Sequence, residues 1–375
     1  MMRALHVYSG NMYGGIERML ATLARERALS PSVEPRFALS HEGRLSRELT
    51  EAGLPPTLLG EVRVSRPFSV RRARRALTEL LAREETDVVI CHSAWAHALF
   101  APVARRAGVP VVFWLHDFVT GSHWTERWAS RTRPVLVIAN SVFTARSASS
   151  MFGAVPVEVV HCPVTLAAPH DDARATVRES LGSTDAELVV LQLGRMESWK
   201  GQSMLLEAMA QLPRHLPWRC WLAGGAVRPA EKVYEAELRQ LARNLGIERR
   251  VAFLGDRDDV PDLLAAADVV CHPSLRPEPF GIAIVEALAA GRAVVASRAG
   301  GVQEIIDQQT GVLFTPGILV ELCEALTALL TDRPRRRALG AAGPDRAAEV
   351  SDPARQLDLL ASLLERYVRP APVSS

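Results

Sequence analysis

The segment DVVICHSAWAHALFAPVARRAGVPVVFWLHD, residues 87–117, contains two short apolar runs at 87–92 and 110–117, separated by a stretch of helical length. Short runs rich in Val and Ile that alternate with amphipathic segments are typical of parallel strands covered on both faces by crossover helices. The same alternation continues on either side. Further apolar runs in the first half are RALHVY, PRFALS, VLVIAN and VEVVHC, and those in the second half are ELVVLQLG, WRCWLAGG, VAFLG, DVVCHP, AVVAS and GVLF. The sequence therefore predicts two α/β units of similar size.

The boundary between the units is expected in PVTLAAPHDD, residues 163–172, which contains two prolines and little periodicity. Near the end of the chain, DPARQLDLLASLLERY at 352–367 has leucines at helical spacing, and Pro353 suits a first helical turn. We therefore expect one domain at 1–168, a second at 169–350, and a helix with a tail at 351–375.

Composition excludes several classes of protein. The chain has 375 residues, of which 48% are hydrophobic and 23% charged, with a formal net charge of +2, as in soluble globular proteins. Disordered, collagen-like and histone-like chains are excluded, and no nucleic-acid partner is expected. The five cysteines form no C-x-x-C pair, no apolar stretch approaches about 18 residues, and no signal peptide is evident, so we expect a cytoplasmic protein with reduced thiols.

The most informative motif is RPEPFGIAIVEALAAG, in which Glu278 and Glu286 are eight residues apart. Glu278 lies among prolines, and Gly281 opens an apolar helix that contains Glu286. Because a carboxylate is costly to bury without donors, Glu286 is expected to meet a ligand's hydroxyl groups; the alternative is that it pairs with a nearby arginine or reaches solvent. The first turn of the helix also offers free N–H groups to an anion.

This motif resembles the E-x7-E core of the retaining, nucleotide-sugar-dependent glycosyltransferases of family four. The resemblance implies the GT-B fold: two facing Rossmann-like domains with an interdomain cleft, and a C-terminal helix that packs back on the N-terminal domain. It also implies that the first domain binds the acceptor and the second the nucleotide sugar. The family's roles then fall on Glu278, Phe280, Gly281 and Ile282 for the donor sugar, and on Glu286 for the ribose.

Two cations follow a strand-like run in LQLGRMESWKGQ, residues 191–202. Arg195 and Lys200 could neutralise a diphosphate, and their effect would be largest as charge develops on the leaving group. Solvated loop cations are the alternative from spacing alone. The resemblance assigns both residues to the diphosphate.

The first half contributes weaker candidates. In SGNMYGGIER, Gly14 and Gly15 follow the first strand; the residues alone fit either a tight turn or a phosphate-binding loop, and the resemblance favours the donor diphosphate. His116 ends the run VPVVFWLH and by resemblance lies near the anomeric centre, although a structural histidine is the alternative. His92, Trp124 and Trp128 are weak acceptor candidates, the tryptophans because aromatic faces stack on sugar rings; folding onto the domain core is the alternative.

No H-E-x-x-H, Cys/His cluster or D-x-D triplet occurs, so no obligatory metal or cofactor is expected. The resemblance implies retaining transfer of a hexosyl group from a UDP- or GDP-sugar to a hydroxyl of a glycan, a lipid-linked molecule or a small molecule. A GT-B epimerase or phosphorylase, or a non-catalytic nucleotide-sugar sensor, is the alternative.

The densest basic run lies in SVRRARRALTELLARE, which predicts a helix with Arg71, Arg72, Arg74 and Arg75 opposite its apolar face. One interpretation is a solvated face. The other is contact with an anionic membrane, which would place a cytoplasmic protein at the inner face of the membrane.

Overall fold

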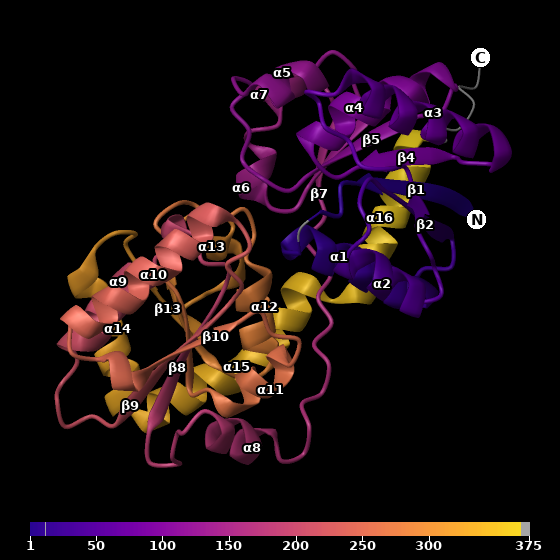
Figure 1. The fold of residues 1–375 in the computed structure, drawn as a ribbon. Coiled ribbons are helices and arrows are strands. Elements are labelled where there is room, and N and C mark those ends of the chain that lie inside the picture. The colour runs from indigo at the N-terminus through magenta and orange to yellow at the C-terminus, as the bar shows by residue number, and fades with distance from the viewer. Residues whose placement is uncertain (12, 369–375) are drawn as a thin grey trace. The chain divides into compact units, whose positions relative to one another are not determined.

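The computed structural model describes residues 1–11 and 13–368, which form two compact units. Unit 1 consists of Met1–Val164 together with the chain from Ser351 onward, and unit 2 is Thr165–Val350 (Figure 1). The chain first passes between units within the proline-containing segment 163–172, and it returns to unit 1 at Ser351.

Unit 1 contains one sheet of seven strands in the order β3-β2-β1-β4-β5-β6-β7, and every neighbouring pair is parallel. The strands are β1 (Met2–Tyr8), β2 (Val33–Leu39), β3 (Thr57–Leu58), β4 (Val88–Cys91), β5 (Val111–Leu115), β6 (Leu136–Ala139) and β7 (Val157–Val159). Six of the seven coincide with the predicted apolar runs. The sequence did not predict β3, because two residues are too few for a periodic pattern.

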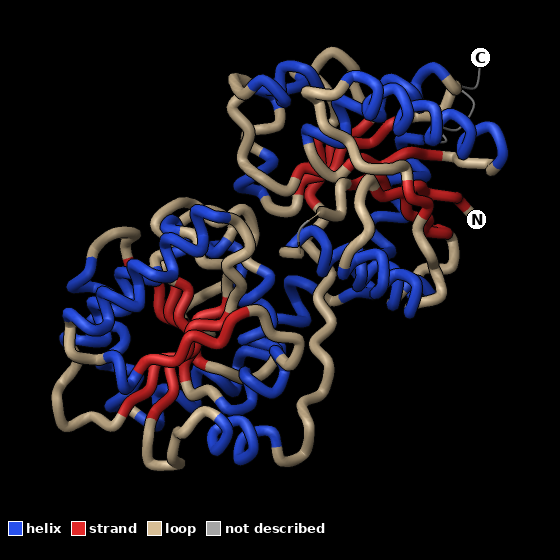
Figure 2. The backbone as a smooth tube through the Cα atoms, viewed as in Figure 1, coloured by secondary structure: helices blue, strands red, loops and turns tan. Residues whose placement is uncertain are grey.

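Helices cover both faces of this sheet (Figure 2). They are α1 (Gly15–Arg25), α2 (Arg44–Glu51), α3 (Pro67–Arg83), α4 (Ala94–Arg106), α5 (Trp124–Ala129), α6 (Val142–Ala145), α7 (Ser149–Phe152) and α16 (Pro353–Val368), with a short 3₁₀ turn, η1 (Arg27–Leu29). Helices α3 and α4 share a core with one face of the strands, including Val7, Cys91 and Phe113. The expected C-terminal helix is α16, and it packs against α1 and η1, as predicted.

Unit 2 contains a second parallel sheet, in the order β10-β9-β8-β11-β12-β13. Its strands are β8 (Leu188–Leu193), β9 (Trp218–Ala223), β10 (Val251–Gly255), β11 (Val269–His272), β12 (Ala293–Ser297) and β13 (Gly311–Phe314). Its helices are α8 (Ala173–Ser180), α9 (Gln202–Gln211), α10 (Pro229–Asn244), α11 (Val260–Ala266), α12 (Ile282–Ala289), α13 (Val302–Ile305), α14 (Leu319–Thr331) and α15 (Arg333–Ser351), with 3₁₀ turns η2 (Ser198–Lys200) and η3 (Glu248–Arg250).

In both sheets the first strand of the unit lies inside the sheet, and the chain adds later strands first on one side of it and then on the other, so the strand order reverses at this strand. Strand β1 lies between β2 and β4, and β8 lies between β9 and β11. In open α/β sheets, ligands bind beyond the carboxyl ends of the strands at such a reversal. The loops after β1 and β8 carry Gly14 with Gly15, and Arg195 with Lys200, so the fold places each predicted loop where its sheet can bind a ligand.

All five cysteines are free thiols, and four of them are buried. Within the described part of the chain, no helix is both long and apolar enough to cross a membrane.

Candidate active site

Arg195 follows β8 and is held by two carboxylates. Its guanidinium contacts Glu197 at 3.0 Å and Glu231 at 3.2 Å. Glu231 is buried, and its second oxygen accepts hydrogen bonds from the backbone N–H groups of Val227 and Arg228 at the start of α10. Arg195 is therefore oriented before any ligand arrives, by a helix that begins 34 residues further along the chain.

Lys200 ends the 3₁₀ turn η2 and contacts the first glutamate of the E-x7-E motif. Its Nζ donates a hydrogen bond of 2.7 Å to Oε2 of Glu278, and it lies 4.0 Å from the centre of the Trp199 ring. The Trp199 indole in turn donates to Glu197, the residue that also holds Arg195. The two predicted cations therefore belong to one hydrogen-bonded loop.

The Glu278 carboxylate has two further partners at the carboxyl end of β11. Nε2 of His272 lies 3.0 Å from Oε2 of Glu278, and Oγ of Ser274 donates to that oxygen at 3.3 Å. Burial by itself raises the pKa of Glu278, but the nearby Lys200 ammonium and the hydrogen bond from His272 together hold this pKa well below its usual range. Glu278 is therefore ionised at neutral pH and accepts hydrogen bonds only.

The motif continues into α12 through a tight backbone turn. Gly281 precedes the first residue of the helix, Ile282, with φ of +120°, and a Cβ there would lie 3.1 Å from the Ile284 side chain. Phe280 is buried below this turn, and Glu286 is buried on the helix that follows. Glycine is required because an L side chain rarely adopts this backbone conformation.

A glycine pair after β12 supports the same loop. The Gly301 N–H donates a 2.8 Å hydrogen bond to the carbonyl oxygen of Glu278, and a Cβ on Gly300 would overlap that oxygen. The backbone segments around residues 278 and 300 therefore approach each other more closely than would be possible if residue 300 had a side chain.

In unit 1, Gly14 caps α1 and Gly15 is its first residue. Tyr13, just before them, donates a 2.6 Å hydrogen bond to Glu48 on α2, and the Arg44 guanidinium lies over the Tyr13 ring. The loop after β1 is thus fastened to a neighbouring helix, and the first N–H groups of α1 lie at the reversal in strand order.

His116 follows β5 and is half-buried, with Nε2 lying 3.0 Å from Nδ1 of His92. Burial lowers the pKa of His116 to about 3, so its ring is neutral at physiological pH. His92 is completely buried. The expectation that His92 contacts the acceptor therefore needs correction, because no part of its side chain reaches the surface.

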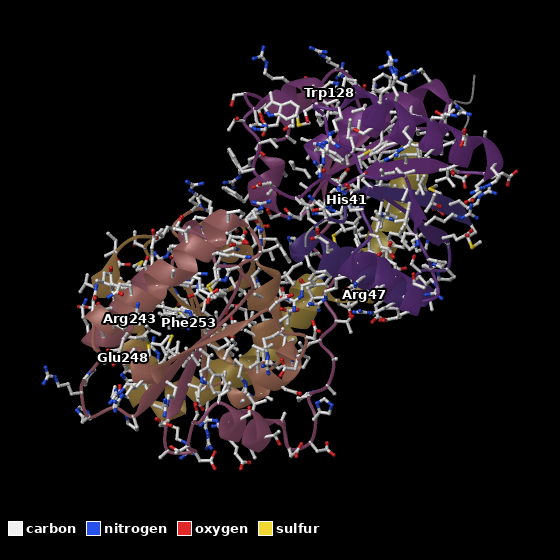
Figure 3. All side chains as sticks on the ribbon, viewed as in Figure 1. His41, Arg47, Trp128, Arg243, Glu248 and Phe253 are labelled. Atoms are coloured by element: carbon white, nitrogen blue, oxygen red, sulfur yellow. The ribbon has the colours of Figure 1, made fainter. Side chains whose placement is uncertain are left out.

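The two candidate tryptophans differ in exposure. Trp128 on α5, labelled in Figure 3, packs against the core beneath α3 and α4, with the Arg74 guanidinium 5.8 Å from its ring centre. Trp124 is 53% exposed and stacks on Trp128 at 6.3 Å. Trp124 therefore presents the more open aromatic face and Trp128 a partly buried one, and contact of either ring with the acceptor stays a prediction.

The structure brings Arg195, Lys200, Glu278 and the start of α12 together at the carboxyl edge of the sheet in unit 2. Sequence reasoning missed His272, Ser274, Glu197, Trp199 and Glu231. His272 and Ser274 lie in CHPS, directly before the motif at a strand end, so their position was a usable signal; Glu231 had none. Among the described residues, no group of three or more His, Cys, Asp or Glu side chains could hold a metal ion.

Two family models match the chain. Residues 13–168 match Glycosyltransferase Family 4, and residues 173–346 match Glycosyl transferases group 1. A protein of Corynebacterium glutamicum, described as a GDP-mannose-dependent monoacylated alpha-(1-6)-phosphatidylinositol monomannoside mannosyltransferase, is 33% identical over 291 residues, which cover 72% of this chain and 73% of that protein. The chain belongs to glycosyltransferase family 4. It is a hexosyltransferase, as the sequence predicted.

A further relative and a solved structure are also similar to this family 4 enzyme over most of its length. A Mycolicibacterium smegmatis protein, described as a GDP-mannose-dependent alpha-(1-6)-phosphatidylinositol monomannoside mannosyltransferase, is 31% identical over 290 residues, covering 71% of this chain and 73% of that protein. The crystal structure of Anabaena HepE in complex with UDP-glucose superposes with a TM-score of 0.86 at 28% identity, over 97% of this chain and all of that one. The family 4 enzyme therefore has the GT-B fold, with a Rossmann-like domain in each unit.

Proposed function

We propose that this enzyme transfers a hexosyl group from a UDP- or GDP-sugar to a hydroxyl group of a glycan, a lipid-linked molecule or a small molecule, with retention of anomeric configuration and without an obligatory metal. Unit 2 binds the donor and unit 1 the acceptor. The observation that carries this proposal is the hydrogen bond between Lys200 and Glu278, with Arg195 nearby. Two oriented cations and one ionised carboxylate therefore lie at the same edge of the sheet.

The cations serve the leaving group. As the bond between the sugar carbon and the phosphate oxygen breaks, negative charge develops on the diphosphate, and fixed positive charges stabilise that state most. Arg195 and Lys200 need little reorganisation, because Glu197, Glu231 and Glu278 already hold them. Glu278 accepts hydrogen bonds from sugar hydroxyls, and Glu286 accepts them from the ribose.

Retention follows a front-face route. The acceptor oxygen bonds to the sugar carbon on the side from which the diphosphate departs, and the acceptor proton moves to a phosphate oxygen. His116 has too low a pKa to donate a proton as an imidazolium at neutral pH, so its role is to form a hydrogen bond, as donor or acceptor, through a neutral ring. Gly14 and Gly15 offer backbone N–H groups to the diphosphate.

The first donor to test is GDP-mannose, because the two bacterial mannosyltransferases above are described as dependent on it. UDP-glucose is the second, because the HepE structure contains it.

Thermal unfolding with UDP, GDP and ADP, with EDTA present, tests the donor site. One nucleotide at about 100 times its dissociation constant should stabilise the wild type by roughly 2.7 kcal/mol. Glu286→Ala should lose this response, whereas Glu324→Ala, which removes an exposed carboxylate on α14, should keep it. NMR of the glycoside formed from the matching sugar nucleotide then reports its anomeric configuration. No nucleotide response, or an inverted product, would refute the corresponding part of the proposal.

We also propose that α3 contacts an anionic membrane. Phe68, in its first turn, is 82% exposed, and Arg71, Arg72 and Arg75 are exposed on the same helix. An apolar ring among cations suits the interface of an anionic bilayer. The predicted basic face is corrected at Arg74. Its guanidinium does not face solvent with the other arginines but donates to the carbonyl oxygens of Leu99 and Ala98 on α4.

Sedimentation with phosphatidylglycerol vesicles tests this contact. Replacing Arg71, Arg72 and Arg75 together by Ser should abolish binding, whereas the matched triple replacement of Arg333, Arg335 and Arg337, all exposed on α15, should not. Equal loss in both variants would show only a nonspecific effect of net charge and would overturn the proposal.

A further inference from the structure

Three histidines, one within β1 and one directly after each of β4 and β5, form a continuous hydrogen-bonded row in unit 1. Nδ1 of His6 lies 2.8 Å from Nε2 of His92, and Nδ1 of His92 lies 3.0 Å from Nε2 of His116. The rings are stacked, with centroids 5.1 Å and 5.3 Å apart. None of these contacts is between neighbours in sequence, so the row exists only because of strand register.

The register explains the row. His6 is opposite Ile90 in the pairing of β1 with β4, and Cys91 is opposite Phe113 in the pairing of β4 with β5. His92 is two residues beyond the partner of His6, and His116 is two residues beyond the position level with His92. Side chains two residues apart on a strand share a face, so all three histidines project from the same face of the sheet. Trp114, completely buried, stacks on both His92 and His116 and closes the row on one side.

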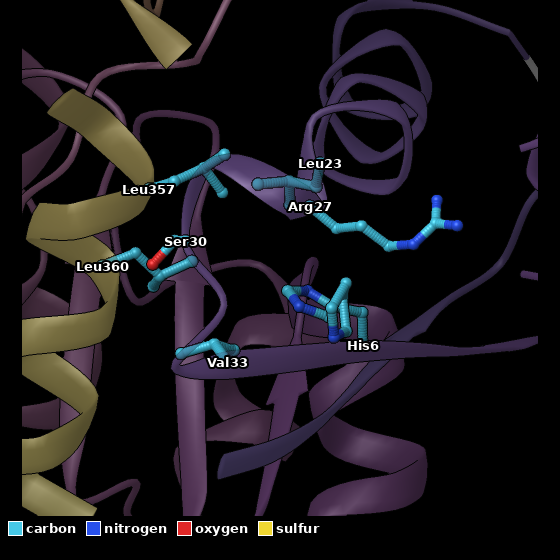
Figure 4. Close-up of a pocket in the computed structure, with 8 residues that line it drawn as sticks. His6, Leu23, Arg27, Ser30, Val33, Leu357 and Leu360 are labelled. Atoms are coloured by element: carbon cyan, nitrogen blue, oxygen red, sulfur yellow. The ribbon is translucent and has the colours of Figure 1, made fainter. Parts of the chain in front are cut away.

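The far end of the row reaches a small cavity. His6 lines a cavity of about 20 Å³ together with Leu23, Leu357 and Leu360, of which the last two belong to α16 (Figure 4). The row therefore connects this cavity with the half-buried ring of His116.

Neutral rings leave only two proton arrangements. Burial lowers the pKa of His6 and of His116 to about 3, and it lowers the pKa of His92 well below its ordinary value. A neutral imidazole carries one N–H and one acceptor nitrogen. If His92 carries its proton on Nδ1, His6 must carry its proton on Nδ1 to donate to His92, and His116 must accept through Nε2. If His92 carries it on Nε2, all three rings carry Nε2–H.

We propose that His6 and His92 are positioning residues that fix the tautomer of His116, and hence whether Nδ1 of His116 donates or accepts a hydrogen bond toward the substrate. This inference rests on the proposed function only for the role of His116; the coupling of the three tautomers rests on the ring contacts and on the burial of the rings. Neither His6 nor His92 touches the substrate.

The decisive variant is His6→Phe, because it preserves an aromatic ring and leaves the direct partner of His116 in place. His97→Phe is the matched control: His97 is an equally buried histidine on α4 that bonds the carbonyl oxygen of Thr132 and has no contact with the row. Both variants lose a buried imidazole, so a purely structural role predicts similar changes in melting temperature and in activity.

Kinetics give the first measurement. We expect His6→Phe and His92→Phe to lower kcat about tenfold, the size expected for one hydrogen bond lost from the transition state, with an unchanged KM for the sugar nucleotide. His97→Phe should keep the wild-type kcat. Equal effects in all three variants would overturn the proposal.

The second measurement is NMR, which does not depend on turnover. Two-bond ¹⁵N–¹H spectra of enzyme with ¹⁵N-labelled histidine report which ring nitrogen carries the proton. In the wild type, His6, His92 and His116 should show one common tautomer, and in His6→Phe the tautomer of His116 should change or become mixed. Unlike tautomers in the wild type would overturn the proposal even if the variants fail to fold. If the wild type transfers no sugar, the proposed function fails while these spectra still test the coupling.

Discussion

Nζ of Lys200 lies 2.7 Å from Oε2 of Glu278, across 78 positions of sequence, and both side chains are mostly buried. The contact joins the loop after β8 to the loop after β11, which are adjacent strands of one sheet. It couples the residue proposed to stabilise the leaving group with the residue proposed to hold the sugar, so a change in either should affect both.

Replacing Lys200 by Ala should reduce kcat/KM sharply. Losing one electrostatic contact to a developing negative charge costs about 2 to 4 kcal/mol, or roughly 30-fold to 800-fold in rate. The control is Lys232→Ala, which removes the only other lysine from an exposed position on α10. Steady-state kinetics measure both variants, with the sugar nucleotide that the thermal-unfolding assay selects as donor. Near-normal turnover by Lys200→Ala would refute the assignment.

The acid stability of the enzyme should depend on Glu278. Because its folded-state pKa lies below the ordinary value of 4.5, ionised Glu278 stabilises the fold above about pH 4.5, and this contribution decreases as the pH falls toward the folded-state pKa. The difference in unfolding free energy between wild type and Glu278→Gln should therefore be largest near neutral pH and shrink in acid. Urea unfolding from pH 3 to pH 7 measures it, and a difference that grows in acid would contradict the expected sign.

Arg178 should be important for stability but not for donor binding. It is 2% exposed, and its guanidinium donates to Asp268 at 2.6 Å and to the carbonyl oxygens of Thr184, Glu187 and Ala266. Arg178→Met leaves Asp268 with reduced compensation and should cost about 3 to 5 kcal/mol.

The matched control for Arg178 is Arg174→Met, because Arg174 contacts the same aspartate at 3.1 Å from a more exposed position. It should cost less than about 1 kcal/mol, as exposed ion pairs do. Chemical denaturation compares the two variants, and similar losses would show that burial is not the deciding factor.

Gly300→Ala should disrupt the donor site. Its Cβ would overlap the carbonyl oxygen of Glu278, so the loop that carries Glu278 must shift. Gly246→Ala is the control, because Gly246 has nearly the same φ, +70° against +73°, but open space around it. Backbone strain of about 1 to 2 kcal/mol should be common to both variants. The response of the melting temperature to nucleotide should be lost only in Gly300→Ala, and its retention there would show that the close approach is dispensable.

The sequence by itself determined the class of fold and most of the strands. Apolar runs such as DVVICH and PVVFWLHD are local signals, because a strand buried on both faces must be apolar at successive positions. The E-x7-E motif was also visible in the sequence, but the roles predicted for its residues and for Arg195 and Lys200 came from the resemblance to family four, because the spacing of the two cations alone fits solvated loop residues equally well.

The tertiary structure decided which side chains meet. Lys200 bonds Glu278 and His6 aligns with His92 because neighbouring parallel strands bring together segments far apart in sequence. Glu231 reaches Arg195 from helix α10, 36 positions further along the chain. Burial was also decided by the tertiary structure, because a sequence window cannot assign Trp128 or His92 to core or surface. Trp128 packs partly buried against the core that includes residues of α3 and α4, and the register of β1, β4 and β5 places His92 in the interior. Local pattern fixes what each segment becomes, whereas contacts across the sheet fix what each side chain can do.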